Sequence, residues 1–145
     1  MALTYFIDSD LDPVVDADAY ANLADMNNLL GYHNVWQAMT DEQKESEIKR
    51  VTAYFDTLDL AGVRVGADAT EQTLEFPRDF GSTASPWAVI DQKKKLLRAV
   101  ASQIEFNLNR PGIGVLEFSR GDLSAIPSQE TLCRPALMAL SVYMK

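Results

Sequence analysis

Residues 85–109, SPWAVIDQKKKLLRAVASQIEFNLN, form the longest run in the chain in which apolar residues recur at helical spacing. Ser85 and Pro86 are typical of a helix start, and Asp91 is a second possible start. A helix does not continue easily through the proline and glycine at positions 111 and 112. We therefore predict a central helix over residues 85–109 that buries one face. Its apolar stripe comprises Val89, Leu96, Leu97, Val100, Ala101, Ile104 and Leu108.

A chain of 145 residues with 47% hydrophobic residues is long enough for one domain with a substantial core. Its single cysteine, Cys133, cannot form an intramolecular disulfide, which is compatible with a reducing, cytoplasmic setting. No apolar run approaches the ~20 residues that a membrane-spanning helix needs, and the N-terminus has neither a basic region nor a cleavage pattern. We expect one soluble, unprocessed domain over residues 1–145 that makes no contact with a membrane.

The net charge of −8 is concentrated in the first third of the chain. Residues 1–43 hold eight acids and no lysine or arginine, whereas residues 44–145 hold thirteen acids and thirteen bases. An acidic surface repels phosphate and disfavours sequence-independent DNA binding by the free protein. Residues 1–21 are predicted to be an extended acidic arm, which either is simply solvated or docks on a basic partner.

Two shorter helices are predicted before the central one. Asn22 is a good N-terminal cap for a short helix that ends at Gly31. Thr40 begins a clearer capping box at the start of a second helix, and we expect Trp36 and Met39 to fold back against its first turn. The apolar stripe of this second helix comprises Ile48, Val51, Phe55 and Leu58.

Residues 59–84 are predicted to be a long loop, and residues 114–126 a β-hairpin. Long loops inside compact domains are uncommon and tend to be functional or partly disordered. Within the loop, Phe76 is expected to pack in the core, and the guanidinium of Arg78, beside Pro77, suits a bidentate contact to a carboxylate. The hairpin consists of two β-like runs about a glycine-centred turn. Because an isolated hairpin is only marginally stable in water, we expect it to pack against the helices or against another chain.

The final segment, residues 132–145, is predicted to be a short helix that begins near Pro135. Only Arg134 and Lys145 are charged in this segment, and most of the remaining residues are apolar. Such a helix either packs into the core or serves as an interface element. The sequence leaves both alternatives open.

Motifs that carry catalytic chemistry are missing from the sequence. It contains no glycine-rich phosphate loop, no pair of cysteines or histidines and no glycine-flanked serine nucleophile. Asp8, Asp10 and Asp12 alternate as in a calcium loop, but Pro13 and Ala19 occupy the positions that need a glycine and a glutamate. We therefore expect no enzymatic activity, no cofactor and no bound metal.

Taken in order, these segments resemble the head–tail connector (adaptor) proteins of tailed bacteriophages. The resemblance covers nearly the whole chain and rests on several stretches, each of which is weak by itself. They are DADAYANLAD at 16–25, Trp36 with TDEQK at 40–44, LEFPR at 74–78, the predicted hairpin at 114–126 and LCRPAL at 132–137.

The resemblance implies a mainly α fold, a small bundle of about four helices around a long central helix with one β-hairpin and a long loop. It implies a structural subunit, made in the host cytoplasm, that forms a homo-oligomeric ring, typically a dodecamer, in the neck of the virion. Such a ring docks beneath the portal protein and extends the channel through which duplex DNA passes, without specific binding, in genome packaging and ejection. It also offers the attachment surface for the stopper or tail-completion protein. The residues expected at the portal or at a neighbouring subunit are Arg78, Lys93, Lys94, Lys95, Phe118, Arg120, Leu137, Leu140 and Tyr143.

Two other functions stay open. A single-stranded DNA-binding, primosome-like module would use Lys93, Lys94 and Lys95 with Arg98, although this cluster has no interleaved aromatic residues for base stacking. A small hydrolase would need two of the many carboxylates to converge in a cleft. The three lysines are also the densest basic run in the chain, so we expect this face of the central helix to meet an acidic N-terminal segment of the same or a neighbouring chain.

Overall fold

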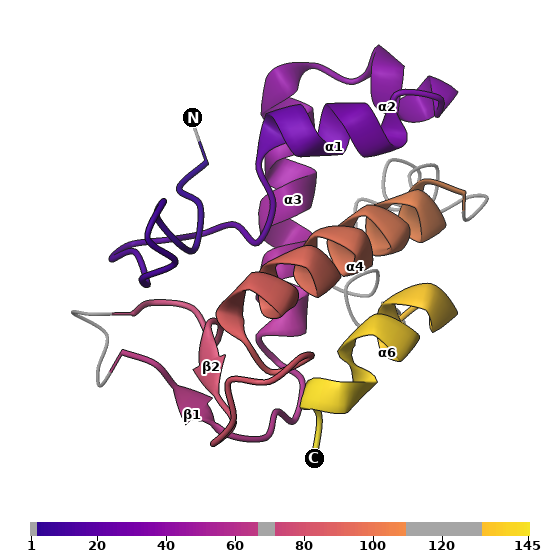
Figure 1. Cartoon of the computed structure of the whole chain (residues 1–145). Coiled ribbons are helices and arrows are strands. Elements are labelled where there is room, and N and C mark those ends of the chain that lie inside the picture. Colours follow the sequence, from indigo (N-terminus) through magenta and orange to yellow (C-terminus); the bar gives the residue numbers. More distant parts are fainter. Residues whose placement is uncertain (1–2, 67–71, 110–131) are drawn as a thin grey trace.

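The computed structural model describes residues 3–66, 72–109 and 132–145, which form a mainly helical structure (Figure 1). The long helix α4 packs against α1, α3 and α6, so the predicted fold class, a small bundle around a central helix, is confirmed. The elements are α1 (Leu23–Leu30), α2 (Asn34–Ala38), α3 (Asp41–Phe55), β1 (Val63–Arg64), β2 (Arg78–Asp79), α4 (Val89–Asn109), α6 (Arg134–Leu140) and the 3₁₀ helix η3 (Ser141–Tyr143).

The two predicted N-terminal caps are confirmed. The side chain of Asn22 accepts a hydrogen bond from the Asp25 backbone N–H at the start of α1. Thr40 and Gln43 form a complete capping box at the start of α3, with each side chain bonded to the backbone of the other residue. These caps satisfy N–H groups that a helix leaves without partners at its first turn.

Helix α2 was not predicted from the sequence. His33 caps this helix of five residues through a hydrogen bond that its Nδ1 accepts from the Trp36 backbone N–H. Trp36 itself is fully buried, and its indole N–H donates to Asn27 Oδ1 at 3.0 Å. Lys44, in the first turn of α3, places its ammonium 5.4 Å from the centre of the indole ring. Trp36 therefore folds back against the start of α3, as predicted.

Helix α4 begins at Val89, four residues later than the Ser85 start favoured by the sequence. The preceding residues form a turn in which the Trp87 N–H donates to the Ala84 carbonyl at 2.8 Å. The carbonyl of Pro86 accepts from the Tyr143 hydroxyl at 2.6 Å, and that of Trp87 accepts from the Gln92 side-chain amide at 2.8 Å. These two carbonyls thus bond to side chains and lie outside the helical hydrogen-bond ladder.

The N-terminal segment is more than a solvated arm. It forms short bridges between Tyr5 and Ala19 and between Ile7 and Pro13, and part of it is buried. Tyr20 connects it to α3, because its backbone N–H donates to Thr52 Oγ1 at 3.0 Å. The buried residues of this segment are Phe6, Ile7, Ala17, Ala19, Tyr20 and Ala21. The prediction of an extended acidic arm is therefore wrong for residues 3–21, since residues 6–7 and most of residues 17–21 are buried in the core.

A row of aromatic rings joins three distant parts of the chain. Phe6 contacts Tyr20, Tyr20 contacts Phe76, and Phe76 contacts Tyr143, with ring centroids 5.2, 5.6 and 5.6 Å apart. All three pairs meet edge to face, which is a favourable arrangement for aromatic quadrupoles. The core thus includes the N-terminal segment, the segment before β2 and the 3₁₀ helix η3. Phe76 is a core residue, as predicted.

The antiparallel pair of β1 and β2 lies inside the segment predicted to be a long loop. Val63 faces Asp79 and Arg64 faces Arg78. Each strand has only two residues, which is too short to show an alternating pattern in the sequence. The predicted hairpin at 114–126 lies outside the described residues, and so do Phe118 and Arg120.

Three buried glutamines hold irregular backbone in place. Gln92 accepts from the Arg78 N–H at 2.9 Å and donates to the carbonyls of Arg78 and Trp87, each at 2.8 Å. Gln72 accepts from the Gly66 N–H and donates to the carbonyls of Leu74 and Pro77. Gln103 accepts from the Cys133 N–H at 2.8 Å, just before α6. Each side chain supplies hydrogen bonds that buried backbone would otherwise lack.

Candidate interaction surface

Arg78, one of the predicted interface residues, lies inside the protein, with only 7% of its surface exposed. Its guanidinium donates to the carbonyls of Ala61 and Gly62 at 2.7 and 2.8 Å, and to the Glu75 carboxylate at 2.6 Å. The predicted partner carboxylate is therefore present, but it belongs to the same chain and is met by one nitrogen rather than two. Arg78 serves the fold, and the expectation that it faces a partner is corrected.

Helix α6 packs along α4 (Figure 1). The residues on its two sides differ in exposure. Ala136, Leu140 and Tyr143 are fully buried, so the expectation that Leu140 and Tyr143 lie at an interface is corrected. Leu137 is 43% exposed and Met138 is 67% exposed. One side of this helix thus packs into the core, and the other side leaves Leu137 and Met138 exposed. We call Leu137 and Met138 the apolar face of α6.

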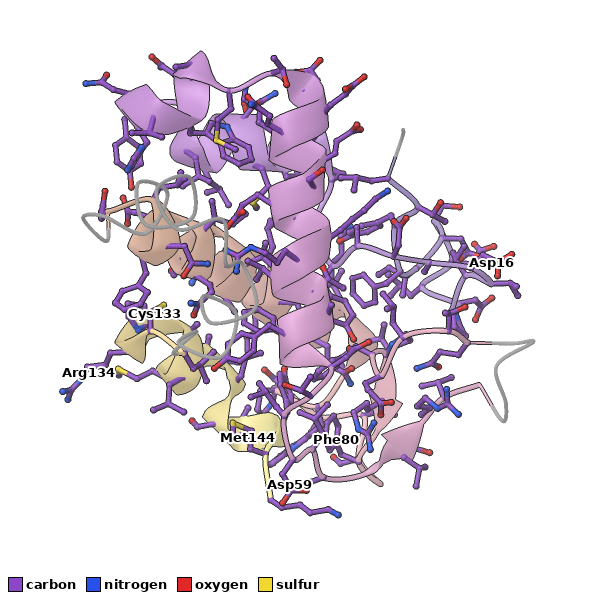
Figure 2. The ribbon with its side chains drawn as sticks, turned by 180° about the vertical axis from the view of Figure 1, so that it is seen from behind. Asp16, Asp59, Phe80, Cys133, Arg134 and Met144 are labelled. Carbon is purple, nitrogen blue, oxygen red and sulfur yellow. The ribbon has the colours of Figure 1, made fainter. Side chains whose placement is uncertain are left out.

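Sequence reasoning listed Leu137 but missed Met138. The signal that could have found both is the helical stripe itself. Ala136, Leu140 and Tyr143 are spaced by four and three residues, and this spacing places them on one side of a helix. Leu137 and Met138 fall off that side, so they cannot be buried by the same neighbour. Figure 2 shows Arg134, at the first position of α6, pointing away from the protein.

The predicted basic residues of α4 occupy its outer side. Lys94 and Arg98 are exposed, and Lys93 and Lys95 are half-buried. We call these four residues the basic strip of α4. In the described part of the chain, no ion pair includes any of them. The acidic N-terminal segment pairs instead with α3, where Asp18 lies 3.3 Å from Lys49. The intramolecular form of the predicted pairing is therefore corrected.

A small hollow of about 250 Å³ lies between α1 and α4, next to the basic strip. Its floor is apolar, and Arg98 and Glu105 contribute charged groups at its edge. The Tyr32 hydroxyl donates to the Glu105 carboxylate, which connects the end of α1 to the C-terminal half of α4. The hollow is lined by Leu29, Leu30, Tyr32, Arg98, Ala101, Ser102 and Glu105. Sequence reasoning did not identify it, because it depends on two helices far apart in the chain.

The aspartates that resembled part of a calcium loop form a compact, exposed turn. The carboxylate oxygens of Asp8, Asp10 and Asp12 lie within 4.8 Å of one another. One carboxylate oxygen of Asp8 accepts from the backbone N–H groups of Asp10 and Asp12 at 2.9 and 3.0 Å. We call these three residues the acidic turn. Asp16, labelled in Figure 2, lies at the outer edge of the same segment and is also exposed.

A buried pair of titratable groups lies beneath the N-terminal segment. The Tyr20 hydroxyl donates to the Asp56 carboxylate and also accepts from the Phe76 backbone N–H at 3.1 Å. Burial raises the pKa of Asp56 from 3.8 to about 6, and the hydrogen bonds from Tyr20 and from the Glu75 N–H oppose that rise. Burial, with the charge of Asp56, also raises the pKa of Tyr20.

We predict that Asp56→Asn stabilises the protein at pH 7 by up to about 2 kcal/mol. The raised pKa means that the folded state binds the proton of Asp56 more tightly than the unfolded state does. Protonated Asp56 therefore stabilises the folded wild type fully below about pH 4, and this contribution is lost as the pH rises through about 6. Asparagine keeps an oxygen that accepts from Tyr20 but does not titrate.

The measurement is urea unfolding of both proteins between pH 4 and pH 8. The free energy of unfolding of Asp56→Asn, relative to that of the wild type, should increase from pH 4 to pH 6 and stay constant above pH 7. Asp41→Asn, at an exposed carboxylate, is the control. A pH-independent difference between Asp56→Asn and wild type would contradict the prediction.

Comparison of the chain with protein-family models, with curated proteins and with solved structures finds no match. No helix among the described residues combines the length and apolar character needed to cross a membrane.

Proposed function

We propose that this protein is a structural subunit of the head-to-tail connector of a tailed bacteriophage. Subunits form a ring that docks beneath the portal, extends the DNA channel and carries the attachment surface for the stopper or tail-completion protein. The motifs that resemble connector proteins motivate the class. The apolar face of α6, Leu137 and Met138, is the structural observation that supports it most directly.

The apolar face of α6 suits a surface that a partner covers. Methionine is enriched at protein interfaces, and an exposed pair of large apolar residues on a well-anchored helix gives a rigid contact. The anchor is strong here, because the Ala61 N–H donates to the Tyr143 carbonyl at 2.8 Å and the Lys145 N–H donates to the Asp59 carbonyl at 3.0 Å. We assign this face to the portal.

The charge of the chain is consistent with the same function. A net charge of −8 disfavours sequence-independent binding to the phosphates of passing duplex DNA. Carboxylates near a channel would keep its wall non-adhesive.

The test mixes the purified chain with a portal of a tailed phage and measures the mass of the complex. Met138→Glu, which adds a charge to the apolar face of α6, is expected to weaken portal binding at least about tenfold, because a charge would be buried without a partner. Ala53→Glu, at an exposed position of α3, is the matched control and should bind as the wild type does. Circular dichroism confirms that both variants fold.

Two outcomes separate the parts of this proposal. If the wild-type chain neither forms a ring nor binds a portal, the connector function is wrong. If it binds and Met138→Glu binds equally well, the portal does not dock on the apolar face of α6. A C-terminal truncation is a poor substitute for these variants, because it also removes Leu140 and Tyr143 from the core.

The alternative function is a single-stranded DNA-binding module, and the basic strip of α4 is the observation that favours it. Lys94 and Arg98 are exposed, so phosphates could reach them. Fluorescence anisotropy with a labelled oligothymidine at low salt tests this function. Binding that is lost on Lys94→Glu with Arg98→Glu would support it, and no binding at low salt would remove it.

A further inference from the structure

The basic strip of α4 makes no ion pair with the described part of the chain, although Glu105 lines the same hollow as Arg98 and Asp91 precedes Lys95 by one helical turn. Lys94 and Arg98 are four residues apart, so two like charges are neighbours on the exposed side of the helix. Such a pair is mutually repulsive. Lys93 and Lys95 add positive charge on either side, and none of the four residues is in an ion pair with a described carboxylate.

The acidic turn has the complementary character. Asp8, Asp10 and Asp12 are all exposed, and their carboxylate oxygens lie within 4.8 Å of one another. The Asp8 N–H donates to the Asp12 carbonyl at 3.0 Å, so the backbone fixes the turn as well as the Asp8 side chain does. Three like charges held this closely repel, and a basic surface brought against them relieves that repulsion.

We propose that the acidic turn of one subunit binds the basic strip of α4 on the next subunit. This inference rests on the proposed function, because it assigns the contact between neighbours in the ring. The acidic turn and the basic strip are different surface patches, so the contact runs head to tail and each subunit uses both patches once. Repeating such a contact closes a ring when the rotation between subunits permits it.

The acidic turn contacts the basic strip of a neighbouring subunit and not that of its own chain, because its own N-terminal segment is fixed on α3. The Thr4 N–H donates to Asp18 at 2.8 Å, and Asp18 pairs with Lys49 of α3 at 3.3 Å. These contacts fix the base of the segment on α3, and its own carboxylates make no ion pair with α4.

The strength of the contact follows from its exposure. Exposed ion pairs are individually weak and are screened by salt, so this contact sets the register of neighbours more than it holds the ring together. Self-association through it should therefore fall steeply as the salt concentration rises. Assembly on a portal should be less salt-sensitive, because the portal aligns the subunits.

The test uses complementary charge reversal in the full chain. The turn variant carries Asp10→Lys and Asp12→Lys, and it keeps Asp8, whose carboxylate holds the turn. The strip variant carries Lys94→Glu and Arg98→Glu, the two exposed members of the strip. Asp41→Lys with Glu42→Lys, two exposed acids of α3, is the control that matches the net charge of the turn variant.

Self-association is measured by sedimentation velocity at low salt, alone and on a portal. The turn variant and the strip variant, each alone, should associate at least about tenfold less than the wild type, because like charges then face each other. An equimolar mixture of the two should recover association, because the lysine turn of one meets the glutamate strip of the other. The control should associate as the wild type does.

Carbodiimide cross-linking of a mixture of ¹⁴N and ¹⁵N chains identifies the contact itself. Mixed-isotope peptides that join Asp10 or Asp12 to Lys93, Lys94 or Lys95 are the expected product. Cross-links confined to one isotope, or a mixture of variants that associates no better than either alone, would overturn the inference. So would a wild-type chain that contacts no second copy in either setting. If the wild type binds a portal and the turn and strip variants assemble normally, the contact between the acidic turn and the basic strip is wrong. The proposed connector function is then unaffected.

Discussion

Gln92→Leu is expected to lower the free energy of unfolding by about 3 kcal/mol, because two buried backbone groups and one half-buried carbonyl lose the hydrogen bonds of the amide. The amide of Gln92 accepts from the Arg78 N–H and donates to the carbonyls of Arg78 and Trp87. Leucine fills a similar volume but makes none of these bonds. The loss should be visible as an earlier urea midpoint with an unchanged slope.

Hydrogen exchange can show where in the fold Gln92→Leu loses stability. Hydrogen exchange at the Arg78 N–H should become faster in Gln92→Leu, because the side-chain oxygen that accepts from this N–H is removed. Gln37→Leu, at an exposed position of α2, is the control and should change stability by less than about 0.5 kcal/mol. Equal midpoints for Gln92→Leu and wild type would show that water or another group replaces the amide.

Trp36→Ala is expected to cost about 3–5 kcal/mol of stability, the usual range for deleting a fully buried large aromatic side chain. The indole fills the space between α2 and the start of α3. Its N–H also donates to Asn27 Oδ1, which accepts from Lys44 Nζ at 3.1 Å too. Thermal unfolding followed by circular dichroism measures the loss.

Two further variants separate packing from polar contacts at this position. Trp36→Phe keeps much of the buried volume but removes the indole N–H, so its cost should be smaller than that of Trp36→Ala. Val35→Ala, next to it but 49% exposed, should be close to neutral. If Trp36→Phe is as damaging as Trp36→Ala, the hydrogen bond to Asn27 matters more than the packing of the ring.

The helix caps could be predicted from the sequence because they are local. Each cap is a hydrogen bond between two residues three positions apart, as in Asn22 with Asp25 and Thr40 with Gln43. The local sequence is therefore sufficient to predict it. Helix α2 was missed because five residues cannot show a helical period. Its cap, His33, is also not one of the usual capping residues.

Features that depend on distant residues could not be predicted. Helix α4 starts at Val89, and the two carbonyls before it accept from side chains, one of which, Tyr143, lies 57 residues beyond Pro86. Arg78 looked available for a partner, but Ala61, Gly62 and Glu75 surround its guanidinium in the fold. Short polar motifs do not reveal such long-range contacts.

The candidate interaction surface could be predicted in part from the sequence. The exposure of Lys94 and Leu137 follows from helical geometry, because both lie off the buried stripe of their helix. Leu140 and Tyr143 could have been assigned to the core by the same reasoning. The hollow between α1 and α4 required the tertiary arrangement, since its lining residues come from two segments about 70 positions apart.

The aromatic row has a consequence for how the chain is made in the cell. Tyr143 completes the row that Phe6 begins, and Tyr143 also closes the turn before α4 through Pro86. A ribosome synthesises a chain from its N-terminus, so Phe76 has no aromatic neighbour from η3 until residue 143 has left the exit tunnel. The core is therefore completed only after translation of that residue. A prematurely terminated chain would expose Phe76 and lack α6, and it would be recognised by chaperones or proteases before it could join an assembly.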